Sequence, residues 1–118
     1  MTTDNQLLDV AVKAADEKNA QLIRSLNMSG VSTIADYFII CHGNSETQVE
    51  AIAREIKNKA EEAGFEVKRI EGMKEARWVL IDLGDIVVHV FHKEDRDYYQ
   101  LEKLWGDAPS VDIEKLLG

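Results

Sequence analysis

The sequence predicts a single α/β domain of the α+β type, in which a mixed five-stranded sheet carries helices in the order α-β-β-α-β-β-β-α. Segments with apolar residues at helical spacing alternate with short runs of β-branched and aromatic residues. The 118 residues contain no internal repeat and no linker rich in proline or glycine, which fits one hydrophobic core. Because the only proline is Pro109, we expect one domain over residues 1–106 and a C-terminal tail over residues 107–118.

Helices are predicted where apolar residues recur every three to four positions. The clearest helix begins at Ser45, which can form a capping box with Gln48, and it is followed by Gly64 in a position suited to a left-handed C-terminal residue. Its apolar stripe consists of Val49, Ile52, Ala53, Ile56, Ala60 and Ala63. The predicted helices span about residues 5–18, 45–63 and 94–105, and a last helical turn is expected within residues 111–117.

Strands are predicted in five segments that are rich in β-favouring residues. The segment Asp36–Cys41 has the composition of a buried strand, and Gly84 lies at the tight turn of a hairpin. The predicted strands span about residues 20–26, 36–41, 65–70, 77–83 and 85–92.

Both faces of the predicted hairpin are largely apolar. Alternation along the first strand places Trp78 and Asp82 on one face and Val79 on the other, while His89 and Phe91 share a face of the second strand. Three helices are few for five strands, so we expect an open apolar face with Trp78, His89 and Phe91 that serves a partner or self-association. The alternative is that Trp78 and Phe91 are core residues, since aromatic side chains are common in both settings.

The charge balance indicates the kind of partner. Fourteen basic residues against 22 acidic residues give a formal net charge of −8. We therefore expect no direct, specific recognition of nucleic acid, because such binding depends on lysine and arginine at the phosphates. The charge favours a basic protein partner, although it also fits a general role in keeping the protein soluble.

The sequence also indicates a compartment. It has no apolar run of the length that crosses a membrane and no N-terminal segment with the composition of a signal peptide. The single Cys41 has no partner for an internal disulfide, which fits a reducing environment. We expect a cytoplasmic protein without membrane attachment.

The titratable side chains form no catalytic or metal-binding motif in the sequence. His89 and His92 point to opposite faces of a strand, and Asp82 and Asp85 are explained by the turn between them. Residues 43–45 (Gly-Asn-Ser) precede a helix and could hold a phosphate, but no Walker lysine follows and helix capping is the simpler account. We therefore expect no catalytic residue, no metal and no cofactor.

Four segments of the chain form a distinctive set: residues 36–45 (DYFIICHGNS), 71–72 (EG), 78–91 (WVLIDLGDIVVHVF) and 98–105 (YYQLEKLW). These segments closely resemble the Iojap family, whose bacterial members are known as ribosomal silencing factors (RsfS). The resemblance extends over nearly all of the chain up to Trp105. The long segment 78–91 is its most specific part.

The resemblance implies a nucleotidyltransferase-like fold that lacks the active site of the enzymes. Residues 43–45 look like the first half of the catalytic motif, but Asp82 and Asp85 do not have the spacing of the Asp-x-Asp pair. The resemblance also implies a partner, the fourteenth protein of the large ribosomal subunit. The bound factor is expected to block docking of the small subunit and so to repress translation under nutrient limitation.

Three hypotheses follow for the function. The first is a silencing factor without enzymatic activity, the alternative is a catalytically active nucleotidyltransferase-like enzyme, and the third is a homodimer when the protein is free, which is compatible with the first. Under the first hypothesis the expected partner-binding residues are Glu71, Gly72, Trp78, Asp82, His89, Phe91, Asp97, Tyr98, Tyr99 and Lys103. Trp78 is the best single candidate, because a buried aromatic anchor can dominate an interface.

Overall fold

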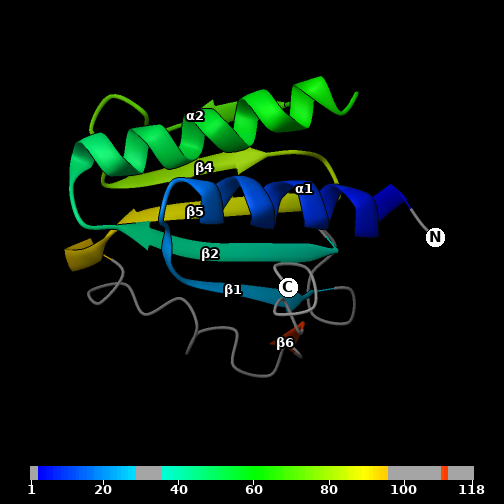
Figure 1. Cartoon of the computed structure of the whole chain (residues 1–118), viewed down its shortest axis with the longest axis horizontal. Coiled ribbons are helices and arrows are strands. Elements are labelled where there is room, and N and C mark those ends of the chain that lie inside the picture. The colour runs from blue at the N-terminus through cyan, green and yellow to red at the C-terminus, as the bar shows by residue number, and fades with distance from the viewer. Residues whose placement is uncertain (1–2, 29–35, 96–109, 112–118) are drawn as a thin grey trace.

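The computed structural model describes the backbone of residues 3–28, 36–95 and 110–111, and the side chains of residues 6–28 and 36–95. Two long helices and six strands lie within these residues (Figure 1). Their bounds are α1 Thr3–Glu17, β1 Gln21–Asn27, β2 Tyr37–Gly43, α2 Glu46–Glu62, β3 Arg69–Glu71, β4 Trp78–Asp82, β5 Ile86–His92 and β6 Ser110–Val111.

The strands form one mixed sheet in the order β3-β4-β5-β2-β1-β6. The central pair, β2 and β5, is parallel, and the other neighbours are antiparallel. A parallel pair needs a crossover connection, and α2 lies in the chain between β2 and β5. The mixed sheet and the α+β class are confirmed, and each of the five predicted strands has a counterpart, although the third differs in its bounds.

Both helices lie across the same face of the sheet (Figure 1). The larger apolar cluster joins buried residues of α1 and α2 to one set of strand residues, including Ile39, Val79, Val88 and Val90. The smaller cluster lies on the opposite face and contains no residue of α1 or α2; its buried members are Leu26, Met28, Phe38, Ile40, Val87 and Phe91. The two faces of the sheet therefore differ in what covers them.

The predicted start of α2 is confirmed in detail. The Ser45 hydroxyl accepts a hydrogen bond from the backbone N–H of Gln48 at 3.1 Å, as a helix N-cap does. The Gln48 side chain accepts from the N–H of Asn44 at 2.7 Å, and its amide donates to the carbonyls of Lys18 and Asn19 at the end of α1. Gln48 thus joins the two helices as well as closing the cap. No helix among the described residues is long and apolar enough to cross a membrane.

Three expectations about elements need correction or fall outside the described residues. The predicted helical turn beyond Pro109 is wrong at Val111, because Ser110–Val111 forms β6 and pairs with Ser25 and Leu26 of β1. The third predicted strand is shorter and later than expected, since residues 65–68 instead pack Phe65 and Val67 against the helix-side core. The predicted helix over 94–105 lies mostly outside the described residues, although residues 93–95 are helical.

Candidate protein-interaction site

Trp78 begins β4 on the face of the sheet opposite α1 and α2. The strand register pairs it with Phe91 of β5, and the two rings stack with their centroids 5.0 Å apart. Phe91 has no exposed surface, whereas Trp78 is only partly buried. The indole therefore rests on a fixed aromatic support and keeps part of its surface available for contact.

His89 fixes the orientation of the same indole. The Trp78 Nε1–H donates a hydrogen bond to Nδ1 of His89 at 3.1 Å, and the imidazole packs edge-on against Phe38 with centroids 4.8 Å apart. Burial lowers the pKa of His89 to about 4, because the charged imidazolium would lose its hydration. The ring is therefore neutral near pH 7, and its Nδ1 is an acceptor that holds Trp78 in one orientation.

Gly72 brings the connection after β3 against the backbone of Trp78. Its φ is +87°, a conformation that favours glycine, and an added Cβ would lie 2.2 Å from the Trp78 carbonyl oxygen. Glu71 ends β3 and is paired with Leu80, so its exposed side chain shares the face of Trp78. The two residues therefore contribute differently, Gly72 through close packing and Glu71 through charge.

Asp82 ends β4 on the same face as Trp78. One carboxylate oxygen accepts a hydrogen bond from the N–H of Gly84 at 2.9 Å, which stabilises the predicted hairpin turn. The other oxygen lies 3.9 Å from Nε of Arg69, which is also 3.3 Å from the Glu71 carboxylate. Arg69 thus partly offsets an acidic rim made by Glu71 and Asp82.

The structure brings six of the predicted partner-binding residues together, five on one face of β3, β4 and β5 and Gly72 against the backbone of Trp78. We call this set the Trp78 face; it consists of Glu71, Gly72, Trp78, Asp82, His89 and Phe91. The other four predicted residues, Asp97, Tyr98, Tyr99 and Lys103, lie outside the described residues.

The expectation of an open apolar face needs correction at two positions. His89 is 4% exposed and Phe91 is 0% exposed. The reason is the smaller apolar cluster, in which side chains of β1, β2 and β5 surround them. The sequence alternative that Phe91 is a core residue is confirmed, whereas Trp78 and Leu80 remain partly buried at the margin of this cluster.

Arg77, which precedes Trp78, organises the adjacent surface and was missed by the sequence reasoning. Its guanidinium lies 2.7 Å from Asp95, 3.2 Å from Glu94 and 3.4 Å from Glu46 at the start of α2. Hydrogen bonds to Glu94 and Asp95 raise the pKa of Arg77, so it stays charged. The cluster of Glu94 and Asp95 after β5 was the available signal, but the position of Glu46 follows only from the fold.

The described side chains do not gather into a set that suggests metal chemistry. Among residues 6–28 and 36–95, no three His, Cys, Asp or Glu side chains could hold a metal ion together. Cys41 is buried within β2, and Asp82 is engaged in the hairpin turn. What the site offers is an oriented aromatic side chain with two carboxylates on the same face of the sheet, which suits recognition of a protein surface.

Comparison with protein families gives a match over nearly the whole chain. The model described as "Ribosomal silencing factor during starvation" (RsfS) matches residues 1–117. The ribosomal silencing factor RsfS of Halalkalibacterium halodurans is 61% identical over 115 residues, which are 98% of each chain. That of Bacillus subtilis is 62% identical over 108 residues, which are 92% of each chain.

A more distant relative carries a name that specifies a ribosomal subunit. The mouse protein named "Mitochondrial assembly of ribosomal large subunit protein 1" is 28% identical over 101 residues, which cover 83% of this chain and 44% of the mouse protein.

Two crystal structures have the same fold. The chain from Bacillus halodurans superposes with a TM-score of 0.82 at 59% identity, covering 92% of this chain and 98% of that chain. The protein from Chromobacterium violaceum superposes with a TM-score of 0.87 at 34% identity, covering 89% of this chain and 88% of that protein. This chain and the protein from Chromobacterium violaceum therefore share the fold although only 34% of their residues are identical.

The fold and the site define a small α+β protein with helices on one face of its sheet and an oriented aromatic residue on the other. Its class is that of regulatory, ribosome-associated proteins, as the names of its relatives state. The chain belongs to the RsfS family of ribosomal silencing factors, and the Iojap resemblance found in the sequence is confirmed.

Proposed function

We propose that this protein represses translation under nutrient limitation by binding the large ribosomal subunit in the cytoplasm. The contact is made to the fourteenth protein of that subunit through the Trp78 face, and the bound factor obstructs docking of the small subunit. The observation that carries this proposal is the half-buried Trp78 of a silencing-factor chain, held in one orientation by Phe91 and His89.

The charge and the family both support a ribosomal protein as the partner. The chain has a net charge of −8, and Glu71 and Asp82 place two carboxylates, with Arg69 between them, on the same face of the sheet as Trp78. Opposite charge on a basic protein speeds encounter and fixes orientation. The name of the mouse relative, which refers to assembly of the large subunit, favours that subunit over the small one.

The proposed mechanism requires binding and no chemical step. Trp78 acts as the anchor, because a partly buried aromatic residue can lose its remaining exposed surface in a contact. Glu71 and Asp82 act at the rim, and the buried His89 and Phe91 act through the position of Trp78. Asp97, Tyr98, Tyr99 and Lys103 complete the proposed contact.

The proposal is tested by sedimenting purified ribosomal subunits through a gradient with and without excess protein. We expect the protein to migrate with the large subunit and joined ribosomes to decrease. Migration at the top of the gradient, with normal subunit joining, would contradict the proposal.

Replacement of Trp78 tests the location of the contact. We expect Trp78→Ala to weaken binding to large subunits by at least about 2 kcal/mol, the size of effect seen at interface anchors. Phe65→Ala is the matched control, since it removes a partly buried aromatic side chain on the helix side of the sheet. If a folded Trp78→Ala variant binds as tightly as Phe65→Ala does, Trp78 is not part of the interface.

A further inference from the structure

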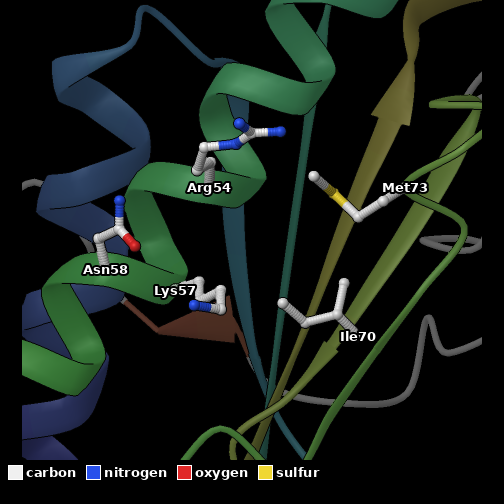
Figure 2. Close-up of a pocket in the computed structure, with 5 residues that line it drawn as sticks. All are labelled: Arg54, Lys57, Asn58, Ile70 and Met73. Atoms are coloured by element: carbon white, nitrogen blue, oxygen red, sulfur yellow. The ribbon is translucent and has the colours of Figure 1, made fainter.

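A groove lies on the helix side of the sheet, away from the Trp78 face. One wall is the outer side of α2, with Arg54, Lys57 and Asn58, and the other consists of Ile70 in β3 and Met73 in the turn that follows. Its volume is about 430 Å³. In Figure 2, Arg54 and Met73 extend toward each other from the two walls.

The groove exists because β3 is the edge strand of the sheet. Among the residues that the structure describes, β3 pairs with β4 and no strand pairs with its outer side. Ile70 and Met73 pack against the helix-side core but are only partly buried. Apolar side chains are thus left at the border between α2 and the sheet edge, where an incoming side chain can cover them.

The charged wall is basic, in contrast to the chain as a whole. Arg54 is exposed and makes no ion pair with another described side chain, whereas Lys57 pairs with Glu61 at 2.9 Å. Such an exposed ion pair contributes little to stability, so Lys57 can readily exchange Glu61 for another carboxylate. A second depression of about 180 Å³ shares Arg54 and Asn58 with the groove and adds a further cation, Lys18. Cations therefore line both depressions, although the chain has a net charge of −8.

We propose that this groove binds an acidic peptide segment of a second protein partner, with an apolar side chain seated between Ile70 and Met73. Carboxylates of the segment pair with Arg54 and Lys57, and Asn58 offers an amide to its backbone. Methionine suits such a contact because its flexible thioether adapts to different side chains.

The composition of the groove favours a peptide over nucleic acid. An apolar wall has no role in holding a phosphate backbone, and the two cations that line the groove, Arg54 and Lys57, are too few to follow one. Because the groove and the Trp78 face lie on opposite sides of the sheet, the two contacts do not compete for the same residues. The factor can therefore bind its proposed ribosomal partner and an acidic protein segment together.

Of the three methionines, Met28 and Met73 lie within the described residues and allow a direct test. The protein is labelled with ¹³C at the methionine methyl groups and titrated with a short synthetic peptide that alternates glutamate and leucine. We expect the Met73 resonance to shift saturably, while Met28, which is 0% exposed on the other face, stays constant. The same peptide with lysine in place of glutamate, and an oligouridylate, should leave Met73 unchanged.

Matched variants separate the groove from overall charge. Arg54→Glu combined with Lys57→Gln should weaken peptide binding at least about tenfold, since it reverses one groove cation and removes the other. Lys93→Glu combined with Lys13→Gln is the control: it changes the net charge equally, and Lys13, like Lys57, has an ion-pair partner four residues away. The control should bind as the unmodified protein does.

Three outcomes would overturn the inference. A Met73 resonance that stays constant at saturating peptide, or equal weakening by both double variants, would remove the groove as a binding site. A shift produced by oligouridylate and not by the acidic peptide would assign the groove to nucleic acid. None of these outcomes bears on co-sedimentation of the protein with large subunits. The groove and the Trp78 face are therefore tested separately.

Discussion

The buried imidazole of His89 makes the stability of the protein sensitive to pH. Its pKa is about 4 in the folded protein, compared with the ordinary value of 6.5. Above pH 6.5 the side chain is neutral in both the folded and the unfolded states and has no effect on the pH dependence. As the pH falls from 6.5 toward 4, the unfolded chain takes up the proton first, so folding stability is lost across this window.

A His89→Asn variant isolates this effect from the other titrating groups. Its amide oxygen can replace Nδ1 as the acceptor for Trp78, but it cannot be protonated in this range. We expect the unmodified protein to lose about 2 kcal/mol more unfolding free energy than the variant between pH 7 and pH 5. Urea unfolding at several pH values measures this difference. Parallel pH profiles for the two proteins would show that His89 is not held neutral by burial.

The close contact with the Trp78 backbone requires a residue as small as glycine at position 72. An alanine there would adopt a φ that L-residues avoid and would also meet the Trp78 carbonyl oxygen. We expect Gly72→Ala to lower the unfolding free energy by at least about 2 kcal/mol and to alter the tryptophan fluorescence. Gly64→Ala is the control, because Gly64 has a φ of +90° with nothing within 4 Å of an added Cβ. Its cost should be about 1 kcal/mol, the strain of the backbone alone; equal losses at both positions would rule out the packing role of Gly72.

At the level of elements, α2 depends on its N-cap. Replacing Ser45 with alanine leaves the N–H of Gln48 without the side-chain acceptor that it has at 3.1 Å. We expect Ser45→Ala to lower the unfolding free energy by about 1 kcal/mol, as measured by thermal or urea denaturation. Thr47→Ala, in the exposed first turn of the same helix, should change it by less than about 0.5 kcal/mol. Similar losses for the two variants would mean that the Ser45 hydroxyl does not stabilise the helix.

The sequence predicted the elements that rest on local patterns. Ser45, the apolar stripe of α2 and the alternation of β4 and β5 are each determined by a few neighbouring residues. All are confirmed except Ala63 of the stripe, which is exposed at the C-cap of α2. The third strand was misplaced because only Arg69–Glu71 pairs with β4, a long-range condition that β propensity does not contain. The strand β6 was missed for the same reason, since its two residues are defined by pairing with β1.

Partners across the sheet could not be predicted from the sequence. Alternation correctly placed Trp78, His89 and Phe91 on one face, but the burial of His89 and Phe91 depends on neighbours from β1 and β2. The parallel register that sets Ile40 beside His89 joins residues separated by the whole of α2, β3 and β4. The bridge from Arg77 to Glu46 is of the same kind, because residues 31 apart meet only after folding.

At the scale of the whole molecule, the net charge acts on the two proposed contacts in opposite directions, whereas the apolar surface favours both. The net charge of −8 attracts a basic ribosomal protein but makes two copies of the chain repel each other. The partly buried Trp78 and Leu80 supply apolar area that either contact can cover. Salt screens charges without removing the apolar contribution, so it can distinguish binding to the partner from the homodimer hypothesis.

We therefore expect the two equilibria to respond oppositely to salt. Raising the ionic strength should weaken binding to the isolated fourteenth large-subunit protein, because their attraction is screened, and should strengthen self-association through the Trp78 face, because repulsion between copies is screened. Calorimetry with the isolated partner and light scattering over a dilution series, each at low and high salt, measure the two responses.

Trp78→Ala should weaken both contacts. A strict monomer at high concentration and high salt would exclude the homodimer, and partner binding that is insensitive to salt would mean that the acidic rim of Glu71 and Asp82 does not contribute to recognition.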